Sequence, residues 1–150
     1  MSVLRLPAAL LESLRVHGEQ TYPQECCGAL LGRPRQGGWR IEAVVPVANA
    51  SAGSEHNRYQ IAPAELVKIA RRARQQGLEI AGFYHSHPDH PAHWSPADLT
   101  EAHWLGCVYV ITEVARGRAA ETSAFLLAGT EEDKHFEPQT IAVEELPLIH

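Results

Sequence analysis

The chain has 150 residues, of which 45% are hydrophobic, and its formal net charge is -5. One domain over residues 1–150 can bury a core at this length without disulfides or a structural metal, so a metal site here can serve chemistry. The acidic balance with scattered basic residues excludes a typical nucleic-acid-binding surface, and no apolar stretch approaches the roughly 20 residues that a membrane span needs. We also expect no signal peptide, and the odd number of cysteines, three, favours the cytoplasm.

Hydrophobic periodicity and turn residues predict alternating helices and strands along the chain. A first helix begins near Pro7, carries an apolar stripe of Leu6, Leu10 and Leu14, and ends at Gly18. Further helices are expected over residues 63–77 and 96–105, and strands over residues 26–32, 39–47, 78–84, 107–111, 122–128 and 134–143. The first two strands form an antiparallel hairpin around residues 36–38. This order predicts an α/β fold with a mixed, mostly antiparallel sheet and helices packed on it.

A histidine-rich segment at the end of the 78–84 strand carries the strongest functional signal. Side chains alternate along an extended chain, so His85 and His87 lie on the same face and can bind one ion. Ser95 and Pro96 are a helix-start signal that makes Asp98 the third helical residue. The S-x-x-D pattern alone is usually a capping arrangement, but the two preceding histidines favour Asp98 as a third ligand.

Two histidines and a carboxylate leave a fourth position for water, which is typical of catalytic zinc sites. Such a site needs a general base and an oxyanion donor as well. Glu25 is the first candidate for the base because it directly precedes an apolar run, where a charge is costly unless it has a task. Spacing alone leaves other acids open as the base: Glu55, Glu65, Glu79, Asp89 and Glu101.

These residues together resemble the JAMM (MPN-plus) zinc metalloproteases. The family pattern is an upstream glutamate, then H-S/T-H-P, seven residues, and S-x-x-D. The chain has Glu25, the tetrad 85–88, the seven residues 88–94 counted from Pro88, and the tetrad 95–98. The segment 22–28, Tyr-Pro-Gln-Glu-Cys-Cys-Gly, also resembles short stand-alone bacterial members. The resemblance implies the MPN/JAMM fold, which is similar to that of cytidine deaminases.

The resemblance also implies a role for each matching residue. His85, His87 and Asp98 would bind one Zn²⁺ per chain, Glu25 would act as general base, and Ser95 would donate to the oxyanion. The expected activity is that of a zinc-dependent peptidase or isopeptidase that cleaves after the C-terminal glycine tail of a ubiquitin-like sulfur-carrier protein. The tail itself is the expected partner, and homodimerisation stays open.

Two other functions are compatible with parts of the pattern. A binding scaffold on the same fold would hold a tail without cutting it, although such relatives typically lack one or more ligands. A deaminase-like zinc hydrolase also pairs zinc with a glutamate, but the chain has no P-C-x-x-C motif. A cysteine protease is a further alternative, against the simpler expectation that all three cysteines are small buried hydrophobes.

The residues around the motif are assigned by their context. His90 and Trp94 are expected to contact substrate, Trp94 as a wall of the channel, and His93 to lie beside the groove without binding metal. His103 is expected to be structural. The polar loop over residues 49–58 is expected to be mobile and to flank the site.

Overall fold

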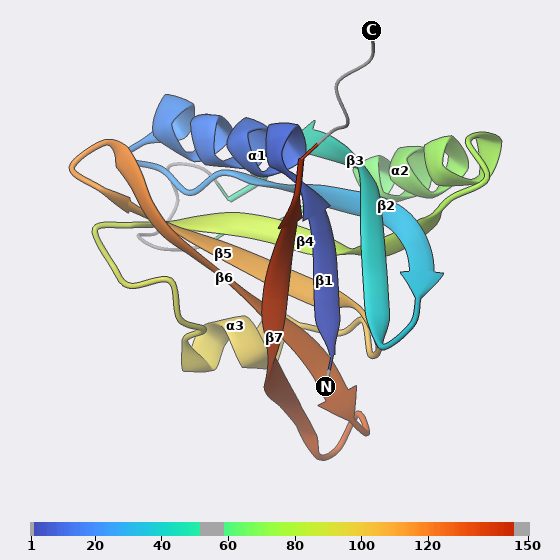
Figure 1. The fold of residues 1–150 in the computed structure, drawn as a ribbon. Helices are drawn as coiled ribbons and strands as arrows, with labels where there is room; N and C mark the ends of the chain where they lie inside the picture. The colour runs from blue at the N-terminus through green and yellow to red at the C-terminus, as the bar shows by residue number, and fades with distance from the viewer. Residues whose placement is uncertain (1, 52–58, 146–150) are drawn as a thin grey trace, which may run out of the picture.

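The computed structural model describes residues 2–51 and 59–145, and within them seven strands form a closed barrel (Figure 1). The strand order around the barrel is β1-β3-β2-β4-β5-β6-β7. The strands are β1 Val3–Pro7, β2 Cys27–Arg35, β3 Gly38–Val47, β4 Glu79–Pro88, β5 Val108–Ala115, β6 Arg118–Gly129 and β7 Lys134–Glu144. β1 runs parallel to both β3 and β7, and β4 runs parallel to β5, whereas the other neighbours are antiparallel. The prediction of a mixed sheet and of a β2–β3 hairpin is confirmed.

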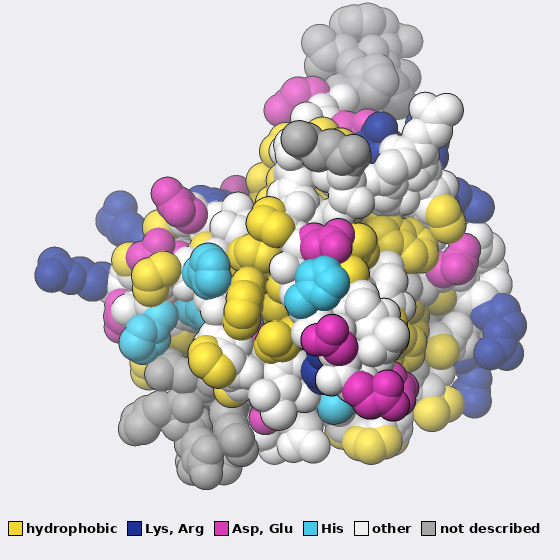
Figure 2. All heavy atoms as spheres, turned by 90° about the horizontal axis from the view of Figure 1, so that it is seen from below, with side chains coloured by type: hydrophobic (Ala, Val, Ile, Leu, Met, Phe, Trp, Pro, Cys, Tyr) yellow, Lys and Arg dark blue, Asp and Glu magenta, His cyan; other side chains and the backbone are white. Residues whose placement is uncertain are grey.

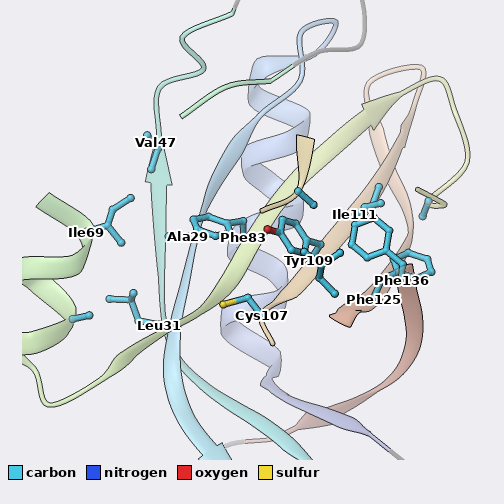
Figure 3. Close-up of a cluster of buried hydrophobic side chains, with 14 residues drawn as sticks. Ala29, Leu31, Val47, Ile69, Phe83, Cys107, Tyr109, Ile111, Phe125 and Phe136 are labelled. Carbon is cyan, nitrogen blue, oxygen red and sulfur yellow. The ribbon is translucent and has the colours of Figure 1, made fainter. Parts of the chain in front are cut away.

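Within the described residues, three helices pack against the strands: α1 Ala8–Thr21, α2 Pro63–Gln75 and α3 Pro96–Glu101. Two hydrophobic clusters divide the core. One holds Leu14 of α1 with Leu30 of β2 and Tyr84 of β4. The other holds Ile69 of α2 with Phe83 of β4 and Tyr109 of β5 (Figure 3). Neighbouring residues of β4 therefore pack into different hydrophobic clusters. None of the described helices is long and apolar enough to cross a bilayer.

The chain start differs from the prediction in two ways. Leu6 lies in a strand, β1, and not on the first helix, so β1 was missed. The helix also continues past Gly18 to Thr21. A side chain at Gly18 would come within 3.0 Å of Val114 and 3.3 Å of Ser86, so the glycine permits close packing inside the helix instead of ending it.

The region of the motif differs as well. β4 continues to Pro88 because residues 82–88 pair with β5, so both predicted histidine ligands lie within a strand and not after it. α3 ends at Glu101 and not near residue 105. The second predicted helix is confirmed, with Pro63 in its first turn and Gly77, at φ +69°, just after its end. Most of the loop predicted over residues 49–58 lies outside the described residues.

Candidate metal centre

The strand β4 places two imidazoles on the α2 and α3 side of the barrel. His85 and His87 alternate with Tyr84 and Ser86, so they share the face of Phe83. Both are buried, with exposed fractions of 2% and 8%. Their Nε2 atoms lie 3.2 Å apart. Two strand neighbours, β2 and β5, hold β4 on either side, so this pair is set on a rigid element.

The start of α3 brings a carboxylate to the same point. Ser95 and Asp98 form a capping box, in which the Asp98 amide donates to Ser95 Oγ at 3.1 Å and the Ser95 amide donates to Asp98 Oδ2 at 2.8 Å. This arrangement fixes the carboxylate toward the histidines. Asp98 Oδ1 lies 3.2 Å from His85 Nε2, and Oδ2 lies 3.1 Å from His87 Nε2.

The three side chains form a metal-binding triad, because their ligand atoms all lie within 4.8 Å of one another. Ligand atoms bound at about 2.0 Å in tetrahedral geometry are about 3.3 Å apart, close to the separations of 3.1 to 3.2 Å found here. His87 Nδ1 is 2.9 Å from the Pro91 carbonyl oxygen and donates to it, which leaves the Nε2 lone pair directed at the centre. The donor set therefore fits a divalent metal ion, as in the JAMM-type site that the sequence predicts.

The ionisation of His85 and Asp98 favours metal binding. Burial lowers the pKa of His85, which keeps its imidazole neutral. Burial alone would raise the pKa of Asp98, but the hydrogen bonds with His85 and His87 hold it well below its usual range. Burial would lower the pKa of His87, but the hydrogen bonds with Asp98 and the Pro91 carbonyl and the charges of Asp98 and Glu25 together outweigh burial and raise the pKa, so a metal ion competes with a proton at this ligand. A cation would replace the proton that these three groups otherwise share.

Glu25 lies two residues before the start of β2 and close to the triad. The Cys26 amide donates to Ser86 Oγ at 2.8 Å, and the Ser86 amide donates to the Cys26 carbonyl at 3.3 Å. This pairing places Glu25 beside His87, although 60 residues separate Glu25 from His85 in the sequence. The side chain is 4% exposed, and burial raises its pKa to about 8, with His87 lowering it and the charges of Asp98 and Glu101 raising it. A bound cation would lower that pKa and favour the carboxylate.

Ser95 is placed beside the triad by the capping box. Its Oγ accepts one hydrogen bond from the Asp98 amide, so the hydroxyl proton stays available for another acceptor. Ser95 lines a hollow of about 320 Å³ together with His87, His90, Pro91, His93 and Trp94. The structure thus brings the predicted substrate residues His90 and Trp94 to the side of the centre where Ser95 lies.

A second hollow, of about 440 Å³, is lined in part by residues that the sequence did not identify as functional. Tyr59 stacks on His85 with ring centroids 4.3 Å apart, and it lines this hollow together with Phe83, Trp104 and Tyr109. No motif surrounds Tyr59, so only its position in the fold identifies it. The stack supports the ring of His85, whose buried Nδ1 has no hydrogen-bond partner among the described residues.

His103 also lines the larger hollow, and its structural role stays a prediction. The helix ends before it, at Glu101, and the residue is exposed. Figure 2 views the molecule from the side on which α3 lies in Figure 1, and it shows histidine and acidic side chains set among hydrophobic ones.

The cysteines do not form a nucleophilic site. All three are free and buried, as expected for small hydrophobes. Burial raises the pKa of Cys26 to about 11 and that of Cys27 to about 12, which disfavours the thiolate that a cysteine protease needs.

Comparison with known proteins identifies the family of this site. The family model for prokaryotic homologs of the JAB domain matches residues 7–128. The chain belongs to the prokaryotic JAB-domain family. The predicted family and fold are therefore confirmed.

Two curated relatives of this JAB-domain chain carry the names of enzymes. A "probable TtuB-protein conjugate cleaving protease" of Thermus thermophilus is 36% identical over 102 residues, which cover 68% of this chain and 65% of that protein. The alignment thus spans slightly less than two thirds of the Thermus protein. A desampylase of Haloferax volcanii is 33% identical over 114 residues, covering 73% and 80% of the two chains.

Solved structures show the same fold. A Desulfitobacterium hafniense protein has a TM-score of 0.79 at 25% identity, with 95% of this chain and 94% of the other covered. A Salinibacter ruber protein has a TM-score of 0.69 at 36% identity, with 97% and 96% covered.

Proposed function

We propose that the protein is a zinc-dependent peptidase or isopeptidase that hydrolyses the bond after the C-terminal glycine tail of a ubiquitin-like sulfur-carrier protein. The proposal rests on one observation: Glu25 and Ser95 lie close to the metal-binding triad of His85, His87 and Asp98. The names of the two curated relatives, a conjugate-cleaving protease and a desampylase, support the substrate class.

Zinc is the metal that we assign to the triad. Two imidazole nitrogens and one carboxylate are the ligands of an open catalytic zinc site. A bound zinc ion supplies Lewis acidity that acidifies water and polarises a carbonyl.

The side chains of the protein perform the proton transfers and the charge stabilisation. Glu25 takes a proton from the attacking water and delivers it to the leaving amine. Its burial beside the triad suits this role, because a carboxylate with a pKa near neutrality can both accept and release a proton. The Ser95 hydroxyl donates to the oxyanion that develops on the carbonyl. Asp98 acts twice, as a ligand and as the partner that orients Ser95.

We propose that the substrate tail lies across the centre between the two hollows. An added strand at an open sheet edge would be another way to hold the tail, but each described strand of the closed barrel already has a neighbour on both sides. The hollow at Trp94 and His90 would hold one side of the scissile bond, and the hollow at Tyr59 the other. The glycines of the tail would then pass the metal.

Three further expectations remain predictions. They are a single domain over residues 1–150, a cytoplasmic location, and a possible homodimer. The buried free cysteines are compatible with a reducing compartment.

The test is to incubate the purified protein with ubiquitin-like carriers that bear C-terminal extensions or a conjugated lysine peptide. Intact mass spectrometry should show loss of the extension after the glycine pair, only in the zinc-loaded protein. Binding of the carriers without cleavage would favour a scaffold, and deamination of nucleosides without peptide cleavage would favour a deaminase-like enzyme.

A further inference from the structure

One hydrogen bond joins the two segments that carry Glu25 and His87. The Tyr22 hydroxyl donates to Asp89 Oδ2 at 2.5 Å across 67 residues of sequence. Tyr22 lies three residues before Glu25, and Asp89 lies two residues after His87. Both residues lie outside the strands, where neither segment is held by regular pairing.

Asp89 is itself fixed at several points. Its Oδ1 accepts a hydrogen bond from the Arg116 amide at 2.8 Å, and its own amide donates to the Val114 carbonyl at 2.8 Å. Its φ of 58° lies in the left-handed region, which Asp tolerates better than most residues. The β5–β6 turn therefore anchors this residue, and through it Tyr22.

The anchored loop also orients a metal ligand. The Pro91 carbonyl, two residues beyond Asp89, accepts the hydrogen bond from His87 Nδ1 at 2.9 Å. Partners of this kind fix the tautomer and the ring direction of a ligating histidine. Asp89 is thus connected to His87 through the loop, and to the segment before Glu25 through Tyr22.

We propose that Tyr22 and Asp89 are positioning residues, whose hydrogen bond sets the place of Glu25 relative to the metal centre. The proposal rests on the proposed function, because it takes Glu25 as the general base. It separates two effects: Tyr22 positions the base alone, whereas Asp89 positions both the base and His87.

Three variants test this division. Tyr22→Phe removes only the donating hydroxyl. Asp89→Gly removes both carboxylate bonds but keeps the left-handed backbone accessible. Glu19→Ala is the matched control, because Glu19 accepts from the Ala119 amide at 2.8 Å and so contacts the start of β6, next to the β5–β6 turn, without a bond to Asp89.

We expect Tyr22→Phe to lower kcat about tenfold, with KM and zinc affinity within about twofold of the wild-type values. Asp89→Gly should lower kcat at least as much and also weaken zinc binding about tenfold, measured by competition with a chelator. Adding Tyr22→Phe to Asp89→Gly should cause no further loss, because the shared bond is already gone. Glu19→Ala should retain the wild-type kcat and zinc affinity.

Hydrogen exchange, a measurement that does not depend on catalysis, completes the test. Both Tyr22→Phe and Asp89→Gly should accelerate hydrogen exchange of the Cys26 amide, which bonds to Ser86 Oγ next to Glu25, and Glu19→Ala should not. Variants that match Glu19→Ala in kinetics, zinc affinity and exchange would overturn the proposal. A wild-type protein that cleaves no carrier would instead refute the proposed function, and zinc affinity and exchange would still decide the positioning.

Discussion

Replacement of Ser95 separates the two tasks that the structure gives this residue. Its Oγ caps α3 by accepting from the Asp98 amide at 3.1 Å, and its free hydroxyl proton lies beside the metal triad. Ser95→Ala removes both, whereas the bond from the Ser95 amide to Asp98 Oδ2 persists because it uses the backbone.

The magnitudes of the two losses differ. Loss of an N-cap side chain costs about 1 kcal/mol when alanine replaces it and only a few tenths when glycine does. For a chain of this size, 1 kcal/mol lowers Tm by about 2–4 °C. Loss of an oxyanion donor lowers kcat by about 10²–10³-fold. Ser95→Gly should therefore keep Tm near the wild-type value and lose as much activity as Ser95→Ala.

The assay pairs thermal unfolding of the zinc-loaded variants with steady-state cleavage of an extended carrier. A Ser95→Gly protein with nearly wild-type kcat would refute the role of Ser95 as oxyanion donor. Ser95 would then contribute only by capping α3. Equal zinc content in all three proteins is the control.

The other predictions concern the metal, the third helix and the substrate wall. Removal of metal by a chelator should lower Tm by about 10 °C relative to protein with zinc at a thousand times its Kd, whereas Asp98→Ala should show no such shift, as read by calorimetry. Lys134→Met should lower stability by about 1 kcal/mol and weaken zinc binding, because Lys134 Nζ donates to the Thr100 and Ala102 carbonyls at the end of the helix that carries Asp98; unchanged denaturant midpoints would contradict this. Trp94→Ala should raise KM for the carrier about tenfold with a smaller effect on kcat, because the indole lines the hollow beside Ser95; an unchanged KM in steady-state kinetics would place the tail elsewhere.

The sequence predicted the local parts of the fold well, because local periodicity carries them. The alternation in β4 put His85 and His87 on one face, and the Ser95-Pro96 signal placed the start of α3 correctly. The helix α2 likewise begins at Pro63 as its spacing predicts.

Nonlocal contacts account for what the sequence could not predict. β1 is a five-residue strand that closes the barrel by parallel pairing with β3 and β7, and such pairing leaves no local signal. Gly18 marks a close approach to Val114 that only the packed structure reveals. The stack of Tyr59 on His85 joins the chain after the 49–58 loop to β4, and no spacing rule connects them.

The proximity of Glu25 to the triad could be predicted from the sequence only in part. Residue type and the family pattern selected Glu25, whereas its position depends on the pairing of Cys26 with Ser86 in the barrel. Without the family pattern, Glu101 would have stayed open as an alternative base behind Glu25. Glu101 lines the larger hollow.

The most direct test of the account is to measure zinc content and cleavage in the same preparation of Glu25→Gln. The substitution keeps the size of a side chain that is 4% exposed and removes its ability to take a proton. The account predicts one zinc per chain, as in the wild type, and cleavage of an extended carrier lowered by at least about 10³-fold. Wild-type turnover by the zinc-loaded Glu25→Gln protein, or full activity of the wild type without metal, would contradict it.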